Sequence, residues 1–242
     1  MKAITAVLVG LFVSGPAWAN SVSVSYLSRY IGSIVTKPIH SEPVLWTDMY
    51  LDLPHDFFFY GWKSMDLQDN DMSSSWGDEF DLTVGRNFDI RDLNWSAAIS
   101  YYNVLPLSEW YDQDVWTTEI RASRSFEVRS HTLRPEMRMG YIWVSKGFSD
   151  GAVYIQPNLN HKFNLTGRLS FSQMLMLSWE DGFDFDGNSS DGLFIRWDPN
   201  LSFNLTNKLT LSVGGVMIEP LHGPKDGRGD ETAFLISLAL SF

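Results

Sequence analysis

The stretch that decides the fold is ETAFLISLALSF, residues Glu231 to Phe242. Large apolar residues occupy every second position, and the positions between them hold mostly small residues. Alternation with a period of two is typical of a β-strand that has one apolar face. The pattern predicts a strand whose apolar face contacts lipid and whose other face is turned inward. The residues predicted to form that lipid face are Phe234, Ile236, Leu238, Leu240 and Phe242.

The same alternation recurs along almost the whole chain after Asn20, interrupted by clusters of Gly, Pro, Asn and Asp. It predicts twelve strands, an even number, as is usual for single-chain outer-membrane barrels. The predicted strands span residues 22–31, 44–53, 57–66, 78–87, 93–103, 115–125, 131–145, 151–162, 166–180, 191–203, 208–219 and 231–242.

The connections between these strands alternate between short turns and longer polar loops. An outer-membrane barrel has short periplasmic turns and longer outer loops. Ten residues of strand tilted near 45° span roughly 23 Å, close to the ~25 Å apolar band of such barrels. The fold class predicted is therefore all-β, a transmembrane up-and-down antiparallel β-barrel of twelve strands with both termini periplasmic. Such a barrel leaves a lumen of roughly 10 Å if nothing fills it.

The N-terminus has the pattern of an export signal. Lys2 precedes an apolar stretch, and Ala17-Trp18-Ala19 forms a small-x-small cleavage site. We expect residues 1–19 to be a cleaved signal peptide and residues 20–242 to form the barrel. The expected location is the outer membrane of a Gram-negative cell.

The composition excludes several classes of function. The formal net charge of −11 argues against nucleic acid as a partner, because neutralising phosphates requires Lys and Arg. The absence of cysteine excludes disulfides, thiolate metal sites and Cys nucleophiles. The stretch DFDGNSSD (184–191) spaces carboxylates as calcium loops do but lacks their closing Glu. No metal site and no cofactor are predicted.

The charged residues on predicted inward faces are the candidate lining of the lumen. A two-residue turn at Val128-Arg129 would place Glu119 opposite Arg138 and Arg121 opposite Glu136, which avoids like charges facing each other. These pairs either brace the wall or line a permeation path. The candidates are Glu119, Arg121, Arg134, Glu136, Arg138, Asp48, Asp52, Lys63, Glu79, Asp81 and Arg196.

Two further patterns concern the rest of the barrel. Residues 156–172 and 198–212 share Pro-Asn-Leu and Phe-Asn-Leu-Thr, followed by a basic residue and Leu, which predicts one hairpin used twice. Aromatic residues near strand ends are typical of the girdles at membrane interfaces. The residues predicted for these girdles are Tyr102, Trp110, Trp116, Trp143, Trp179 and Trp197.

Three functions are compatible with these patterns. The first is a porin-like passive channel for small solutes, with acidic outer loops that favour cations. The second is a closed structural or binding barrel. The third is an outer-membrane lipid hydrolase, which needs a Ser–His pair near the outer leaflet. Only His40 and His222 fall in predicted outer loops, and no G-x-S-x-G or H-E-x-x-H motif is present. We therefore do not expect an enzyme.

The first third of the chain resembles the TorF-type family of predicted porins, a conserved bacterial outer-membrane family of unknown function. The residues that carry the resemblance are LSRYIGS (27–33), Pro43-Val44, FFYGWKSMD (58–66) and GDEFDLTVG (77–85). Ile31-Gly32 stands where the family usually has Arg-Gly. The resemblance implies an exported all-β protein of the outer membrane and a pore of unassigned substrate.

The expected partners follow from this location. They are the lipid bilayer, lipopolysaccharide that shares divalent ions with the acidic loops, and the outer-membrane assembly machinery. The terminal Phe242 resembles the C-terminal aromatic residue that this machinery recognises. No segment of the sequence indicates a trimer, so a monomer is expected.

Overall fold

The computed structural model describes residues 20–32, 38–67, 79–103, 115–144, 151–181, 192–222 and 230–242. The predicted signal peptide, residues 1–19, and the calcium-like stretch, residues 184–191, lie outside these ranges. Trp110 and most acidic residues of the predicted outer loops lie outside them as well.

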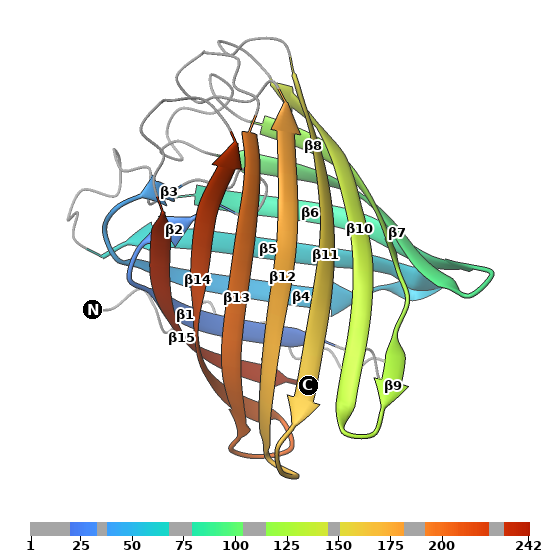
Figure 1. Cartoon of the computed structure of the whole chain (residues 1–242), viewed down its shortest axis with the longest axis vertical. Helices are drawn as coiled ribbons and strands as arrows, with labels where there is room; N and C mark the ends of the chain where they lie inside the picture. Colours follow the sequence, from blue (N-terminus) through green and yellow to red (C-terminus); the bar gives the residue numbers. More distant parts are fainter. Residues whose placement is uncertain are drawn as a thin grey trace.

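The described residues form a closed antiparallel barrel of twelve strands, so the predicted fold class is confirmed (Figure 1). Each strand pairs with its neighbours in sequence, and β15 pairs with β1 to close the sheet. Within the described ranges, no helix is both long and apolar enough to cross a bilayer. The barrel strands are β1 (Ser21–Leu27), β4 (Val44–Asp52), β5 (Phe57–Asp66), β6 (Glu79–Ile90), β7 (Leu93–Asn103), β8 (Val115–Ser123) with its continuation β9 (Phe126–Val128), β10 (His131–Val144), β11 (Ala152–Asn164), β12 (Leu169–Asp181), β13 (Gly192–Asn204), β14 (Leu209–His222) and β15 (Glu231–Ser241).

Both ends of the barrel sequence lie at the end that carries the short turns. The Phe242 amide donates a hydrogen bond to the Asn20 carbonyl at 3.1 Å. Five short connections lie at this end, and they cover residues 53–56, 91–92, 129–130, 165–168 and 205–208. This end is called the turn end below, and the opposite end the loop end.

The outer surface is apolar, as the alternation predicts. The five predicted lipid-facing residues of β15 are all exposed, from 38% at Phe242 to 45% at Phe234. Trp116, Trp143, Trp179 and Trp197 are exposed too. The prediction that Tyr102 belongs to a girdle is wrong. Tyr102 lies on the inward face of β7 and lines the internal cavity.

The first predicted strand, residues 22–31, is shorter in the structure. β1 ends at Leu27, and the chain bends at Ser28-Arg29 and then turns into the lumen. Its next residues form β2 (Tyr30–Ile31), which pairs with β3 (Pro38–His40) as a small separate hairpin. Both β2 residues are buried, so the continuous alternation of 22–31 covers two elements with different surroundings.

The predicted register between the sixth and seventh strands is wrong by two residues. Arg121 lies directly opposite Arg138, and Glu119 lies opposite Gly140. The turn consists of Arg129-Ser130, one residue later than expected, with Arg129 at φ 57°. A positive φ at the first central residue alone is the feature of a two-residue hairpin turn of type II′, so the turn chemistry sets the register here.

The repeated sequence does form the same turn twice, which confirms the predicted shared hairpin. In each copy a Thr hydroxyl accepts two amide hydrogen bonds. Thr166 accepts from Arg168 at 3.2 Å and Leu169 at 3.0 Å. Thr206 accepts from Lys208 and Leu209 at the same two distances. Side-chain hydroxyls that bond nearby amides in this way stabilise turns.

We predict that Thr166→Ala and Thr206→Ala each lower the free energy of unfolding by about 1 kcal/mol, because each removes the acceptor of two turn amides. Urea unfolding of the refolded barrel, followed by tryptophan fluorescence, measures this change. Thr166→Ser and Thr206→Ser keep the hydroxyl and serve as controls. A serine variant as destabilised as its alanine counterpart would contradict this explanation.

Candidate functional site in the barrel lumen

The lumen contains a cavity of about 880 Å³ along the half of the barrel formed by β4 to β10. Its lining includes Val115 and Ile142 near the loop end. It also includes Asp89 and Asn94 near the turn end. One internal space thus extends along most of the length of the strands.

The inward segment, Tyr30 to Gly32, narrows the lumen near the loop end. The Tyr30 hydroxyl donates to the Glu79 carboxylate, and burial beside that carboxylate raises the pKa of Tyr30 well above its ordinary value. Ile31 packs against Phe194 and Ile218 of the far wall. Arg196 donates from Nη1 to the Gly32 carbonyl at 2.8 Å. The segment is therefore held from both sides of the barrel.

Aromatic side chains surround Tyr30 on the inner face of β4 and β5. The Tyr30 ring centroid lies 5.5 Å from those of both Trp46 and Trp62. The two tryptophan centroids are 5.2 Å apart in an edge-on arrangement. Edge-to-face and tilted rings at these distances attract one another beyond their area burial. This aromatic cluster fixes the inward segment against one wall.

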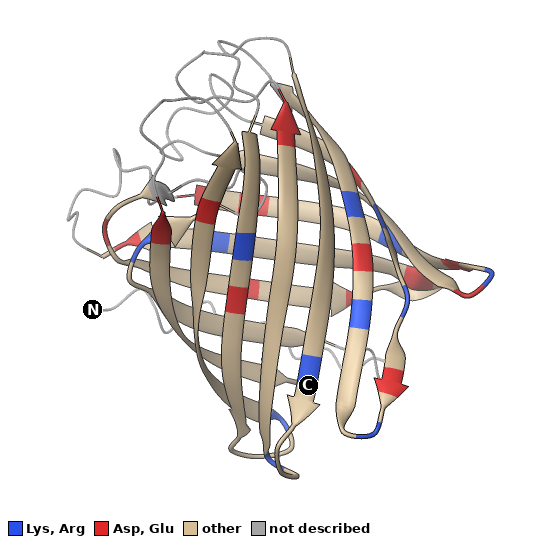
Figure 2. Cartoon of the chain, viewed as in Figure 1, with Lys and Arg blue, Asp and Glu red and all other residues tan. Residues whose placement is uncertain are grey.

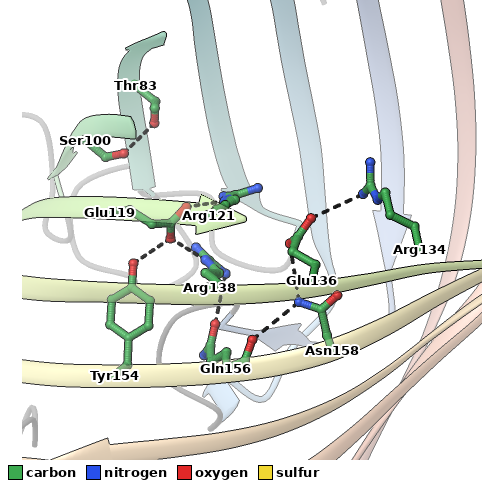
Figure 3. A network of polar contacts seen from close by, with 10 residues as sticks. All are labelled: Thr83, Ser100, Glu119, Arg121, Arg134, Glu136, Arg138, Tyr154, Gln156 and Asn158. Atoms are coloured by element: carbon green, nitrogen blue, oxygen red, sulfur yellow. Dashed lines mark hydrogen bonds and ion pairs between the residues drawn. The ribbon is translucent and has the colours of Figure 1, made fainter. Parts of the chain in front are cut away.

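The main charged group of the cavity is centred on Glu119 of β8 (Figure 3). Its Oε1 accepts from the Nε of Arg121 and its Oε2 from the Nε of Arg138. The Tyr154 hydroxyl donates to Oε2 at 2.5 Å. Tyr154 reaches this carboxylate across Gly140, where a Cβ atom would overlap the Tyr154 ring.

Glu119 explains how the observed register tolerates two arginines face to face. Like charges directly opposite on neighbouring strands are destabilising. Here the carboxylate lies two residues from Arg121 on β8 and diagonal to Arg138 on β10, so it pairs with both guanidinium groups and reduces their repulsion. The register predicted from sequence is wrong because the prediction considered only the charges of directly opposite residues.

The polar network continues toward β11 and the turn end. Arg138 also donates from Nη1 to Gln156 at 3.2 Å. Glu136 accepts from Asn158 at 3.3 Å and forms an ion pair with Arg134 at 3.5 Å. Alternating basic and acidic positions along β10 are visible in Figure 2. The wall formed by β8, β10 and β11 is thus cross-linked by hydrogen bonds and ion pairs in which three arginines share two carboxylates.

The structure places the predicted lumen residues as follows. Asp48 accepts a hydrogen bond from Ser23 on the inward face of β4, and Asp52 lies on the same face at the turn end. Arg196 pairs with Asp198 at 2.8 Å. The members of the predicted set that line the cavity are Glu79, Asp81, Glu119, Arg121, Arg134, Glu136, Arg138 and Arg196.

The prediction for Lys63 is wrong. Its neighbours along β5, Trp62 and Ser64, are buried on the inward face, at 8% and 0% exposure. The cross-strand partners of Lys63 are Thr47 and Phe80, so its side chain starts from the outer face. The parity of β5 is hard to read from sequence because aromatic residues occupy both of its faces.

The sequence analysis missed the residues that shape the cavity most. Alternation alone predicts that Tyr30 and Ile31 end a strand and that an outer loop begins at Gly32. Trp46, Trp62 and Tyr102 were not recognised as inward, because aromatic residues near strand ends are usual at membrane interfaces. Trp46 lies two positions from the polar Asp48, and this shared strand parity indicates that Trp46 faces inward. The polar Asp81 gives the same indication for its neighbours.

The two histidines considered for lipid hydrolysis are engaged differently. His40 pairs with Asp66 at 2.7 Å, but the neighbouring Ser41 hydroxyl donates to Glu42 at 3.5 Å. His222 is the last residue of β14. These contacts do not build a nucleophile–base pair from His40 and Ser41. The described residues also hold no cluster of three His, Cys, Asp or Glu side chains suited to a metal.

The comparisons with known proteins show the fold. No protein-family model and no curated protein sequence matches the chain. Among solved structures, an outer-membrane channel from Pseudomonas putida F1 superposes with a TM-score of 0.56 at 12% identity, covering 96% of this chain and 98% of its own. The NanC porin gives 0.58 at 9% identity, covering 93% and 100%. The KdgM porin gives 0.57 at 8% identity, covering 92% and 99%.

These similarities concern the whole barrel and not a shared set of site residues, because the identities are low. The chain therefore has the architecture of an outer-membrane porin-type barrel. The similarity to the TorF-type family stays a prediction.

We predict that Glu119→Gln lowers the free energy of unfolding by about 3 kcal/mol, since it leaves two guanidinium groups without their shared counter-charge. Urea unfolding in detergent micelles measures the loss. Glu136→Gln is the matched control: Arg134 is 47% exposed, so removing its charge partner costs less than about 1 kcal/mol. Equal losses in the two variants would contradict a central role for Glu119.

Proposed function

We propose that this protein is an outer-membrane channel for small solutes. The observation that carries the proposal is the single cavity, about 880 Å³ in volume, whose lining residues extend from the loop end to the turn end. Polar and charged side chains line it, while the outer face is apolar. A closed barrel with an apolar outside and a polar interior is the arrangement of membrane channels.

The location in the outer membrane is part of the same proposal. The apolar belt and exposed tryptophans of the outer face support it, as does the likeness to outer-membrane barrels. The predicted signal peptide, residues 1–19, supports export. With the turn end in the periplasm, both ends of the barrel sequence lie on that side. A monomer is proposed, since each barrel closes on itself.

The inward segment is the feature that controls passage in this proposal. It lies across part of the lumen and is held by Glu79, Arg196 and the aromatic cluster. Because its anchors lie on its own side chains and not in the ladder of the barrel sheet, a single substitution can loosen it without disturbing the barrel wall. In the alternative function, a closed structural barrel, the inward segment stays fixed in the lumen.

We predict discrete conductance steps when the refolded protein is inserted into planar lipid bilayers. Ile31→Ala should enlarge those steps or make them fluctuate, because truncating a buried Ile removes about 2 kcal/mol of packing on the far wall. Single-channel recording in potassium chloride measures both effects.

Phe234→Ala, on the lipid face of β15, is the control and should keep the wild-type conductance. Faster migration of unheated than of heated samples on gels verifies that each variant is folded. Folded wild-type protein that gives no conductance steps would overturn the channel proposal in favour of a closed barrel.

The assembly machinery is a further proposed partner. The backbone amide of Phe242 donates to the Asn20 carbonyl, and a side-chain substitution leaves this bond in place. We predict that Phe242→Ala slows assembly in cells while leaving the unfolding free energy of the refolded barrel within about 0.5 kcal/mol. Pulse labelling of the compact, heat-modifiable form measures assembly. Phe234→Ala is again the control, and equal slowing by both variants would contradict a terminal signal.

A further inference from the structure

Two carboxyl groups at the loop end of the cavity have no ion-pair partner among the described residues. Glu79 and Asp81 lie two positions apart on the inward face of β6 and are 6% and 7% exposed. The described arginines of the cavity pair with other carboxylates, two of them with Glu119, one with Glu136 and one with Asp198. These arginines are Arg121, Arg134, Arg138 and Arg196.

The two carboxyl groups are also close to each other. They are hydrogen-bonding neighbours, while Glu79 additionally accepts from Tyr30. Two carboxyl groups in contact away from bulk water cannot both stay ionised without sharing a proton or a cation. The pair therefore holds one proton or one cation between its two carboxyl groups.

Unpaired buried oxygen atoms point to a ligand at the same place. Asp81 Oδ1 is buried and has no hydrogen-bond partner. Ser64 is fully buried, lies directly opposite Glu79 on β5, and its Oγ has no partner either. Buried polar atoms are normally satisfied, so unsatisfied ones beside a cavity indicate a missing partner.

Aromatic rings flank the carboxyl groups and select the kind of cation. Asp81 lies directly between Trp62 on β5 and Tyr102 on β7, and all three line the cavity. Tyr30 and Tyr60 line it as well. Aromatic faces attract organic cations, whereas calcium and magnesium require six or more oxygen ligands. The ring-rich surroundings favour an ammonium group over a metal ion.

We propose that Glu79 and Asp81, with Trp62 and Tyr102, form a binding site for small organic ammonium ions in the lumen. The ammonium group contacts the two carboxylates, and the rings contact its carbon substituents. The proposal rests on the proposed channel function, in which this site concentrates organic cations at the narrow part of the path beside the inward segment.

Calorimetric titration of the refolded protein in micelles with choline tests the site. Its neutral isostere, 3,3-dimethyl-1-butanol, has the same shape without the charge. We expect choline to bind, and the isostere to bind at least about tenfold more weakly. Loss of the charge removes the attraction to the carboxylates and the attraction to the aromatic rings. Glu79→Gln and Asp81→Asn should each weaken choline binding about tenfold.

Glu136→Gln is the matched control, since its carboxylate lines the same cavity but is already paired with Arg134. It should keep the wild-type affinity. Equal binding of choline and its isostere, or equal affinity in all three variants, would overturn the site. Displacement of choline by an equimolar amount of magnesium chloride would overturn its preference for organic cations.

The titration separates this proposal from the channel proposal. Choline that binds to a protein without conductance steps supports the site and removes the channel. Conductance without choline binding supports the channel and removes the site. With both present, choline added to one side of a bilayer should reduce potassium current through the wild type and not through Asp81→Asn.

Discussion

The constraint on which this structure depends is that a sheet in hydrocarbon must pair every backbone N–H and C=O group within itself. The pairing of β15 with β1 meets it, because it removes the two edges that a twelve-stranded open sheet would leave. The alternating apolar positions of ETAFLISLALSF follow from the same closure. Once the sheet is a cylinder, each strand has one face toward lipid and one toward the lumen, so a period of two must recur in every strand.

Closure also determines what the inside contains. A lumen enclosed by twelve strands is too wide to be filled by the side chains of its own wall. The protein fills part of it with the inward segment and cross-links another part through Glu119, Arg121, Arg138 and Tyr154. The inward segment and the cross-linked network have different effects on the lumen. The network on β8, β10 and β11 pairs its carboxylates with arginines and stiffens the wall, whereas the inward segment occupies part of the path.

The fold could be predicted from the sequence almost completely, but the lumen could not. Strand number, alternation and the unequal connections are properties of the closed sheet itself, and each strand repeats them. The register of β8 and β10 depended on the turn at Arg129-Ser130, whose positive φ does not show in the charge pattern. The inward position of Tyr30 and Ile31 depended on partners far away in sequence, among them Glu79 and Phe194. Ser28 is the one polar residue in the otherwise apolar series of even positions from Val22 to Tyr30, and a single interruption does not separate wall from segment.

The selectivity of such a barrel depends on unpaired charge near the path more than on the total charge of the chain. Exposed charges are screened beyond about 8 Å at physiological ionic strength, so acidic residues outside the lumen act weakly on a solute within it. Inside, Glu119, Glu136 and Asp198 are each paired with at least one arginine, so none of them offers an unpaired negative charge to a solute. Glu79 and Asp81 are the described cavity pair without such a match, and they lie where the inward segment leaves least room. A preference for cations, expected at first from acidic loops, therefore has its stronger physical basis at these two residues.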